Sequence, residues 1–171
     1  NRAHLSPWLP WAMNEETLQE RLEWVLGSRA AFEDGRDFAY GAFDRATGAL
    51  VGGSGLHTRC GAGGLEVGYW VAKDHLRRGL ATEMTAIMTR AAIERCECVR
   101  VEVRVDPRNT ASLGIPEKLG FVREGLLLKR IQHRDDWIDL VSFCMPAEAL
   151  SASPAAAFPY EARNALGHTL K

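Results

Sequence analysis

Hydrophobic and charged residues alternate most regularly near the middle of the chain. From Val99 to Asp106, valine occupies every second position and a charged residue each position between. A period of two places successive side chains on opposite faces of a strand, so this segment predicts a β-strand with one strongly apolar face. The segment Leu65–Val71, rich in β-branched and aromatic residues, predicts a second strand.

Two other segments carry the spacing of amphipathic helices, with apolar residues three and four positions apart. One helix is expected to start at Leu80, after the polar turn Lys73–His75. The other is expected to begin at Asn14, a good N-cap residue followed by Glu15 and Glu16, where the helix dipole favours acids. The expected apolar stripes are Leu80, Met84, Ile87, Met88 and Ala91 in the first, and Leu18, Leu22, Val25 and Leu26 in the second.

The remaining segments predict further strands and one short helix, giving the order β-β-β-α-β-α-β-β. This order is typical of an α/β (α+β) fold with a sheet of mixed strand direction, and we expect one domain over residues 1–146. Residues 147–171 show no sustained period and predict a peripheral or flexible tail. The expected elements are strands Asp37–Asp44 and Leu50–His57 around the turn Arg45–Gly48, a helix Asn109–Gly120, and strands Phe121–Ile131 and Trp137–Met145 around the loop His133–Asp136.

The glycines at 52, 53 and 55 resemble part of a dinucleotide-binding loop. Thr58 occupies the position of the third glycine, and no amphipathic helix follows, so this interpretation fails. The glycines instead predict a bulge or a close approach of backbone.

Charge and cysteine content limit the possible functions. The chain has 21 basic and 22 acidic residues and no basic block, which argues against nucleic acid as the main ligand. No apolar run is long enough to span a membrane. The four cysteines, at 60, 96, 98 and 144, lack a usual zinc spacing, so we expect no metal and reduced thiols in a cytoplasmic protein.

A predicted strand, a short basic loop and a helix N-terminus together suggest an anion site. The first N–H groups of a helix have no partner within it, and the dipole there is positive. Gly79 and Ala81 lack bulk, so a phosphate can approach the backbone, and Arg77 and Arg78 add positive charge.

Two motifs resemble those of the GNAT acetyltransferases. Arg77–Ala81 is similar to the loop that binds the acyl-CoA pyrophosphate, and Asn109–Ser112 with Lys118–Phe121 is similar to a second signature, N-x-x-S followed by E-K-L-G-F. With Leu5–Trp11, the pattern resembles the RimJ/RimL-like branch, named for enzymes that acetylate the N-termini of ribosomal proteins. The resemblance covers about Asn1 to Met145, and the family would place a first strand before Asn1.

The resemblance implies a fold, a co-substrate and a set of site residues. Acetyl-CoA would lie between two splayed central strands, Leu65–Val71 and Val99–Val105, and donate its acetyl group to an amine. Ser112 matches the serine of the RimJ/RimL-like pattern. The implied cofactor-binding residues are Tyr69, Trp70 and Val71 for the pantetheine, Arg77, Arg78, Gly79, Leu80, Ala81 and Thr82 for the pyrophosphate, and Asn109 and Lys118 of the second motif.

Several groups are candidates for the base that deprotonates the amine. Glu66 is the first, because strand alternation places it opposite Leu65 and Val67, although a salt-bridged or solvated carboxylate is the alternative. Glu102, flanked by arginines, is better suited to an ion pair. His57 has a suitable imidazole but stands alone at a strand end, and water is a fourth candidate.

The sequence departs from the family pattern at two positions. Leu76 replaces the usual Gln or Arg of the pyrophosphate loop, which should matter little because backbone N–H groups do most of the binding. Pro116 occupies the position where many relatives carry the tyrosine that protonates the thiolate. Ser112 then offers a hydroxyl from that helix in its place.

The acceptor is the least determined part of the site. An α-amine is ~10% neutral at pH 7 and a lysine amine only ~0.04%, so an α-amine needs less help from a base. A protein N-terminus and a small-molecule amine both remain open, as does an acyl-CoA-binding sensor with little catalysis. Trp8 and Trp11 either form walls of the acceptor pocket or are packing aromatics, and we favour packing. The oligomeric state stays open between a monomer and an assembly such as a homodimer.

Overall fold

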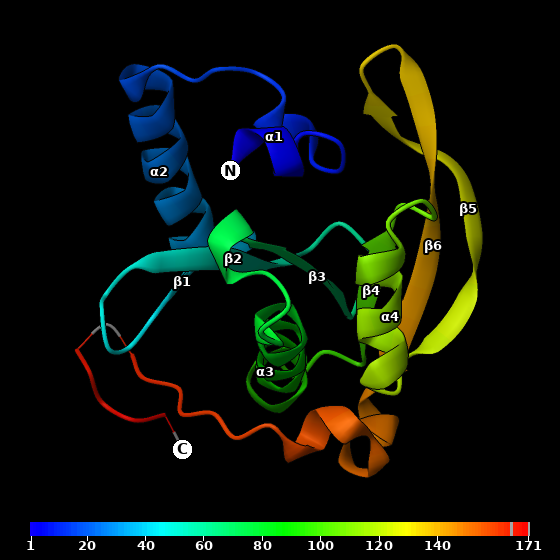
Figure 1. The fold of residues 1–171 in the computed structure, drawn as a ribbon. Coiled ribbons are helices and arrows are strands. Elements are labelled where there is room, and N and C mark those ends of the chain that lie inside the picture. Colours follow the sequence, from blue (N-terminus) through cyan, green and yellow to red (C-terminus); the bar gives the residue numbers. More distant parts are fainter. Residues whose placement is uncertain (165, 171) are drawn as a thin grey trace.

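The computed structural model describes residues 1–164 and 166–170, and a six-stranded sheet in the order β1-β2-β3-β4-β6-β5 forms its centre (Figure 1). Neighbouring strands are antiparallel except β3 and β4, which run parallel. The predicted order of elements and the mixed sheet are confirmed. The strands are β1 (Asp37–Phe43), β2 (Leu50–His57), β3 (Gly64–Val71), β4 (Arg100–Val105), β5 (Val122–His133) and β6 (Asp136–Pro146).

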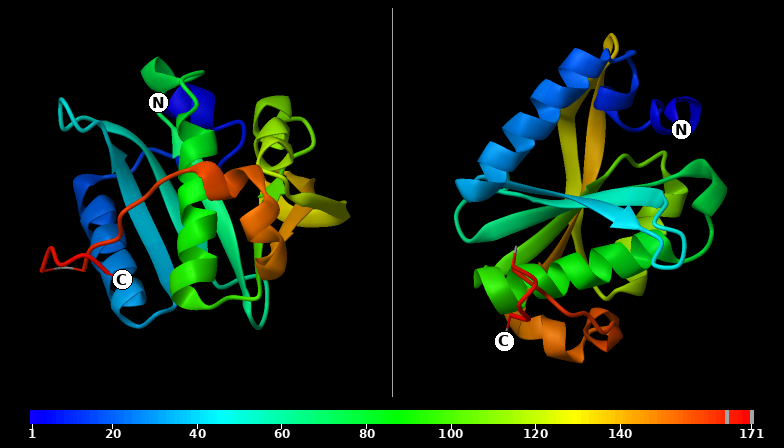
Figure 2. Two further views of the ribbon diagram at one scale, coloured as in Figure 1. Left: turned by 90° about the horizontal axis from the view of Figure 1, so that it is seen from below. Right: turned by 90° about the vertical axis from the view of Figure 1, so that its left-hand side faces the viewer.

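Helices lie on both faces of this sheet (Figure 2). On one face is α2 (Leu18–Glu33); on the other are α3 (Leu80–Cys96) and, beside it, α4 (Thr110–Lys118). Among the described residues, no helix combines the length and the apolar character needed to cross a bilayer. The short elements are α1 (Arg2–Leu5) and the 3₁₀ turns η1 (Pro10–Ala12), η2 (Lys73–His75), η3 (Ala147–Ala152) and η4 (Pro154–Ala157).

Helix α2 differs from its prediction at its start and in its packing. Its N-cap is Thr17, not Asn14: the Thr17 hydroxyl accepts from the Glu20 N–H, and the Glu20 carboxylate accepts from the Thr17 N–H. This capping box satisfies two backbone donors, which Asn14 cannot do from three residues upstream. The predicted stripe of α2, which includes Leu18 and Leu22, is exposed, because the main contact of the helix is with β1, the first strand of the sheet.

Helix α3 turns a different face to the sheet from the one predicted. Its buried residues are Thr85, Ala86, Thr89 and Ala92, whereas the predicted stripe is only partly buried. The two threonine hydroxyls donate to the carbonyls of Ala81 and Thr85, each at 2.7 Å, so their polar atoms are satisfied within the helix. Small residues therefore bring α3 close to the sheet, with the larger ones at the flanks.

The strand predictions hold, with one correction at the start of β4. Val101, Val103 and Val105 are buried, but Val99 precedes the strand and is exposed. The predicted close approach at the glycines of β2 is confirmed, because a Cβ on Gly52 would lie 2.5 Å from the carbonyl oxygen of Trp70.

The segment after β6 is not peripheral throughout, contrary to expectation. Leu150 in η3 and Ala155 in η4 are buried in the same core as β4 and β6, and η4 contacts α3. Arg90 of α3 also donates to the Phe158 carbonyl at 2.6 Å. Two short 3₁₀ segments bury these residues without a helical or strand period, so the hydrophobic pattern did not predict their burial.

Candidate active site

The central feature of the candidate site is the splay of β3 and β4. Only three residue pairs join these strands, the last of them Glu66 with Glu102. Beyond this point β3 continues beside β2, as far as Val71, and β4 continues beside β6. In the described chain, the edge of residues 67–71 that faces β4 therefore has no partner strand. The predicted splay is confirmed. It leaves the backbone of Tyr69 without a strand partner on this edge, whereas Trp70 pairs with Gly53 of β2 and the Val71 carbonyl accepts from the His4 ring at 3.0 Å.

The loop before α3 has the geometry of an anion site. Arg77 and Gly79 have positive φ angles, 61° and 79°, which turn successive N–H groups toward one side. The first hydrogen bond of the helix runs from the Glu83 N–H to the Gly79 carbonyl, so in the described chain the N–H groups of Leu80, Ala81 and Thr82 have no helical acceptor.

The loop is also open and basic. A Cβ added to Gly79 would meet no atom within 4 Å, so a bound group can approach the backbone. The Arg78 guanidinium donates to the Asp74 carbonyl at 3.1 Å and braces the loop, whereas Arg77 is exposed. These features fit a pyrophosphate group.

Helix α4 presents the second motif. The Asn109 side-chain oxygen accepts from the Ser112 N–H at 3.1 Å, so Asn109 is the N-cap, and its amide NH₂ group is left for a ligand. Among the described residues, the Ser112 hydroxyl has no hydrogen-bond partner, which leaves it available. Lys118 is exposed in the last turn of the nine-residue helix, about 13 Å along the axis from its start. The structure thus separates Lys118 from Asn109.

Tyr69 and Glu66 lie on opposite faces of β3. The Tyr69 side chain packs against the core beside α4, and its burial raises the pKa of the phenol to about 12. Glu66 points to the face that carries α2, because residues on a strand alternate. Ser112 and Glu66 are therefore on opposite sides of the sheet, and the splay lies between them.

Glu66 and Glu102 belong to one buried network of ion pairs. The Glu66 carboxylate is 2.6 Å from the Arg59 guanidinium and 3.4 Å from that of Arg104. Glu102 pairs with Arg100 at 2.9 Å and Arg104 at 2.8 Å, which confirms its predicted ion-pair role. The hydrogen bond from Arg59 to Glu66 raises the pKa of that guanidinium. The Glu66 oxygen that lies 3.4 Å from Arg104, Oε2, is buried and makes no hydrogen bond among the described residues.

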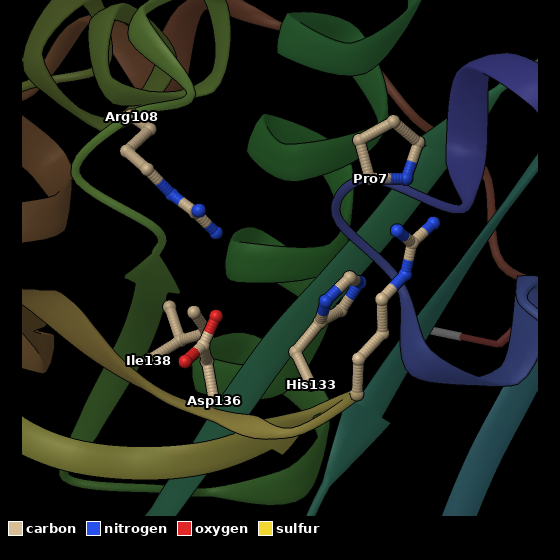
Figure 3. Close-up of a pocket in the computed structure, with 6 residues that line it drawn as sticks. Pro7, Arg108, His133, Asp136 and Ile138 are labelled. Atoms are coloured by element: carbon tan, nitrogen blue, oxygen red, sulfur yellow. The ribbon is translucent and has the colours of Figure 1, made fainter.

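A cavity of about 330 Å³ adjoins the start of α4 (Figure 3). In Figure 3, Arg108 and Asp136 reach toward the same space from two segments, with the ring of His133 beside Asp136. His133 Nε2 is 2.8 Å from the Ser6 carbonyl, which holds the start of the chain against the β5–β6 hairpin. Trp11 stacks edge-on against Trp70 at 6.0 Å, so it packs as expected, and it remains half-exposed.

The sequence did not indicate two residues of this site, Arg59 and Asp37. Arg104 shares a strand face with Glu102 and is one of the flanking arginines that predicted the ion pair of Glu102. Arg59, which pairs with Glu66, and Asp37, whose carboxylate is 2.6 Å from His57, come from other strands and a loop. Their contacts depend on strand register, which no local pattern specifies.

Comparison with known proteins gives consistent similarities. The family model for the acetyltransferase (GNAT) domain matches residues 1–122. The probable N-acetyltransferase YjcK of Bacillus subtilis (strain 168) is 29% identical over 126 residues, 72% of this chain and 69% of the relative. The putative ribosomal N-acetyltransferase YdaF of the same organism is 29% identical over 128 residues, 73% of this chain and 68% of the relative. The solved structure of Mycobacterium smegmatis RimJ in complex with CoA-disulfide is similar with a TM-score of 0.80 and 28% identity, covering 91% of this chain and 76% of that one.

Proposed function

Because the chain belongs to the GNAT acetyltransferase family and is an acetyl-CoA-dependent N-acetyltransferase, we propose that its acceptor is the α-amine of a protein N-terminus. The observation that carries this assignment is the splay of β3 and β4, with the Glu66 carboxylate, whose Oε2 makes no hydrogen bond, on one side and the Ser112 hydroxyl, which also makes none among the described residues, on the other. The two groups can then act on opposite ends of one transfer.

In this proposal, each end of the reaction has its own residue. Acetyl-CoA supplies the acetyl group, held by the N–H groups of residues 80–82, the Asn109 amide and the free edge of β3. Glu66 accepts a proton from the ammonium of the acceptor, and the neutral amine then attacks the acetyl carbon. Ser112 donates a hydrogen bond to the departing thiolate, whose pKa near 8.5 lets it leave with modest help. The acyl-CoA-binding sensor is not favoured, because both reactive groups are present: the Ser112 hydroxyl has no hydrogen-bond partner among the described residues, and Glu66 Oε2 keeps a lone pair without one.

The charge of the acceptor side supports an α-amine over a polyamine. The ion-pair cluster around Glu66 on this side contains three arginines and three carboxylates, so the cluster itself has no acidic surplus to attract a multiply charged amine. The nearby cavity of Arg108, His133 and Asp136 offers both donors and acceptors, which suits a peptide backbone. YdaF, a relative by sequence, is named as a putative ribosomal N-acetyltransferase. The expected cytoplasmic location would place the enzyme with such an acceptor.

The test is a thiol-release assay with acetyl-CoA and three classes of acceptor. These are peptides with a free N-terminus, the same peptides with a blocked N-terminus and a free lysine, and spermidine. We expect release only with the free N-terminus, and fragmentation in the mass spectrometer should place the acetyl group there. Thiol release with spermidine alone would mean that the acceptor is a small amine and not a protein N-terminus. Tight binding of acetyl-CoA without any thiol release would favour the acyl-CoA-binding sensor.

A further inference from the structure

A row of polar residues crosses the sheet beside the candidate base. Asp37 lies directly opposite His57, His57 opposite Glu66, and Glu66 opposite Glu102, on four adjacent strands. Side chains at directly opposed positions share a face, with Cβ atoms about 4.5–5.5 Å apart. The side-chain exposure along the row falls from 48% at Asp37 through 22% at His57 to 6% at Glu66. The row therefore connects the buried carboxylate to solvent.

The imidazole of His57 is held in one orientation. Its Nδ1 is 2.6 Å from the Asp37 carboxylate, so this nitrogen carries the proton and Nε2 presents a lone pair. The ring lies over two facing glycines, Gly55 and Gly68, and a Cβ at Gly68 would come within 3.0 Å of Nε2. Side chains at either position would crowd the ring. Gly68 is two residues beyond Glu66, at the start of the splay.

Glu66 needs an outlet for the proton that it accepts. Its carboxylate is buried between Arg59 and Arg104, and a proton taken from each acceptor must leave before the next turnover. Among the described residues, those that face His57 are Asp37 from β1 and Glu66 from β3, with Arg59 near both carboxylates.

We propose that His57 is a proton-transfer residue that carries the amine proton from Glu66 to solvent, an inference that rests on the proposed transfer to an amine. The N–H bond of the ammonium breaks and its proton binds Glu66 Oε2. That proton then passes to His57 Nε2, directly or through one water, while Nδ1–H stays bonded to Asp37. The imidazolium returns the Nε2 proton to water or buffer, so the residues end each cycle unchanged.

The test compares His57→Gln with the wild type and with His168→Gln, a matched change at an exposed histidine in the C-terminal segment. For His57→Gln we expect kcat to fall about tenfold or more, with unchanged affinity for acetyl-CoA. Added imidazole should restore kcat of this variant in a saturable manner and should leave the wild type and His168→Gln unaffected. A merely structural histidine would give no such rescue.

A second variant keeps the ring. Asp37→Asn removes the carboxylate acceptor at Nδ1, and ¹⁵N NMR of the imidazole should show mixed tautomers in place of one, together with a lower kcat. A His57→Gln enzyme with full kcat, under conditions in which chemistry limits the rate, would overturn the proton-transfer role of His57 and leave the proposed function standing. A folded His57→Gln enzyme whose kcat is lowered and is not restored by added imidazole would also overturn it. Absence of wild-type turnover would instead contradict the proposed function.

Discussion

The hydroxyl of Tyr69 donates a hydrogen bond of 3.3 Å to the main-chain carbonyl of Ser112. In a regular helix this carbonyl would accept from the N–H four residues later, but Pro116 stands there and has no N–H. The phenol from β3 takes the place of that donor, and α4 continues unbroken through Pro116. The contact ties the strand that borders the splay to the helix that carries Ser112.

Replacement of Tyr69 by Phe should destabilise the protein, because the Ser112 carbonyl loses its donor. We expect the free energy of unfolding to fall by about 1 kcal/mol in urea titrations at neutral pH. Tyr40→Phe is the matched control, since Tyr40 is exposed and its hydroxyl has no partner among the described residues, and it should change stability by less than about 0.5 kcal/mol.

The same variant predicts a difference at alkaline pH. Burial raises the pKa of Tyr69 to about 12, against 10 in the unfolded chain, so the unfolded state loses its proton first. The stability that the neutral phenol contributes is complete below pH 10 and is lost as pH rises toward 12. Across this window the free energy of unfolding of the wild type should fall by roughly 1–3 kcal/mol more than that of Tyr69→Phe. An equal loss in both proteins would mean that Tyr69 is not buried as described.

Elements that depend on a local period could be predicted, and contacts between distant segments could not. The alternation around Val101 and Val103 specified β4, and Gly120 with its φ of 84° ends α4 as expected. The start of α2 at Thr17 could also have been found, because Thr17 and Glu20 have the capping-box spacing.

The candidate site shows the limit of sequence patterns more clearly. The two motifs, which are local stretches of sequence, were enough to indicate Gly79 in the first and Asn109 and Ser112 in the second. The partners of Tyr69 and His57 lie 43 and 20 residues away, and strand register and the packing of α4 bring them together. The buried face of α3 depends similarly on how closely small residues let the helix approach the sheet, which hydrophobicity alone does not specify.

Gly79→Asp should abolish the stabilisation that acetyl-CoA gives the fold. At one hundred times its Kd, acetyl-CoA should stabilise the wild type by about 2.7 kcal/mol. A carboxylate at Gly79 adds bulk and negative charge where the pyrophosphate would bind. Gly125→Asp makes the same change at an open position of β5, and this variant should keep the full stabilisation by acetyl-CoA in thermal or urea unfolding. Equal stabilisation of a folded Gly79→Asp protein would remove the loop from the cofactor site.

Asn109→Asp separates helix capping from cofactor binding. Aspartate caps a helix as well as asparagine, so stability should change by less than about 0.5 kcal/mol, but the amide donors are lost. We expect acetyl-CoA affinity, measured by calorimetry, to fall about tenfold. Asn109→Ala should lose both functions, with about 1 kcal/mol less stability. Unchanged affinity in Asn109→Asp would leave Asn109 as a cap only.

Ser112→Ala tests the hydrogen bond to the thiolate. If the hydroxyl acts in the transition state, kcat should fall by ~10²-fold or more with little change in acetyl-CoA affinity. Thr110→Ala, at an exposed hydroxyl on the same helix, is the control and should keep full kcat. Full activity of Ser112→Ala, with chemistry shown to limit the rate, would assign the protonation of the thiolate to water.

The measurement that tests the site most directly is amide hydrogen exchange with and without saturating acetyl-CoA. Bound in the splay, acetyl-CoA would lie against the free edge of β3 and the first turn of α3, so exchange at residues 69–71 and 80–82 should slow more than exchange in β1. Slowing in these two segments together would locate acetyl-CoA in the splay of β3 and β4. Unchanged exchange there, with protection elsewhere or nowhere, would contradict the account.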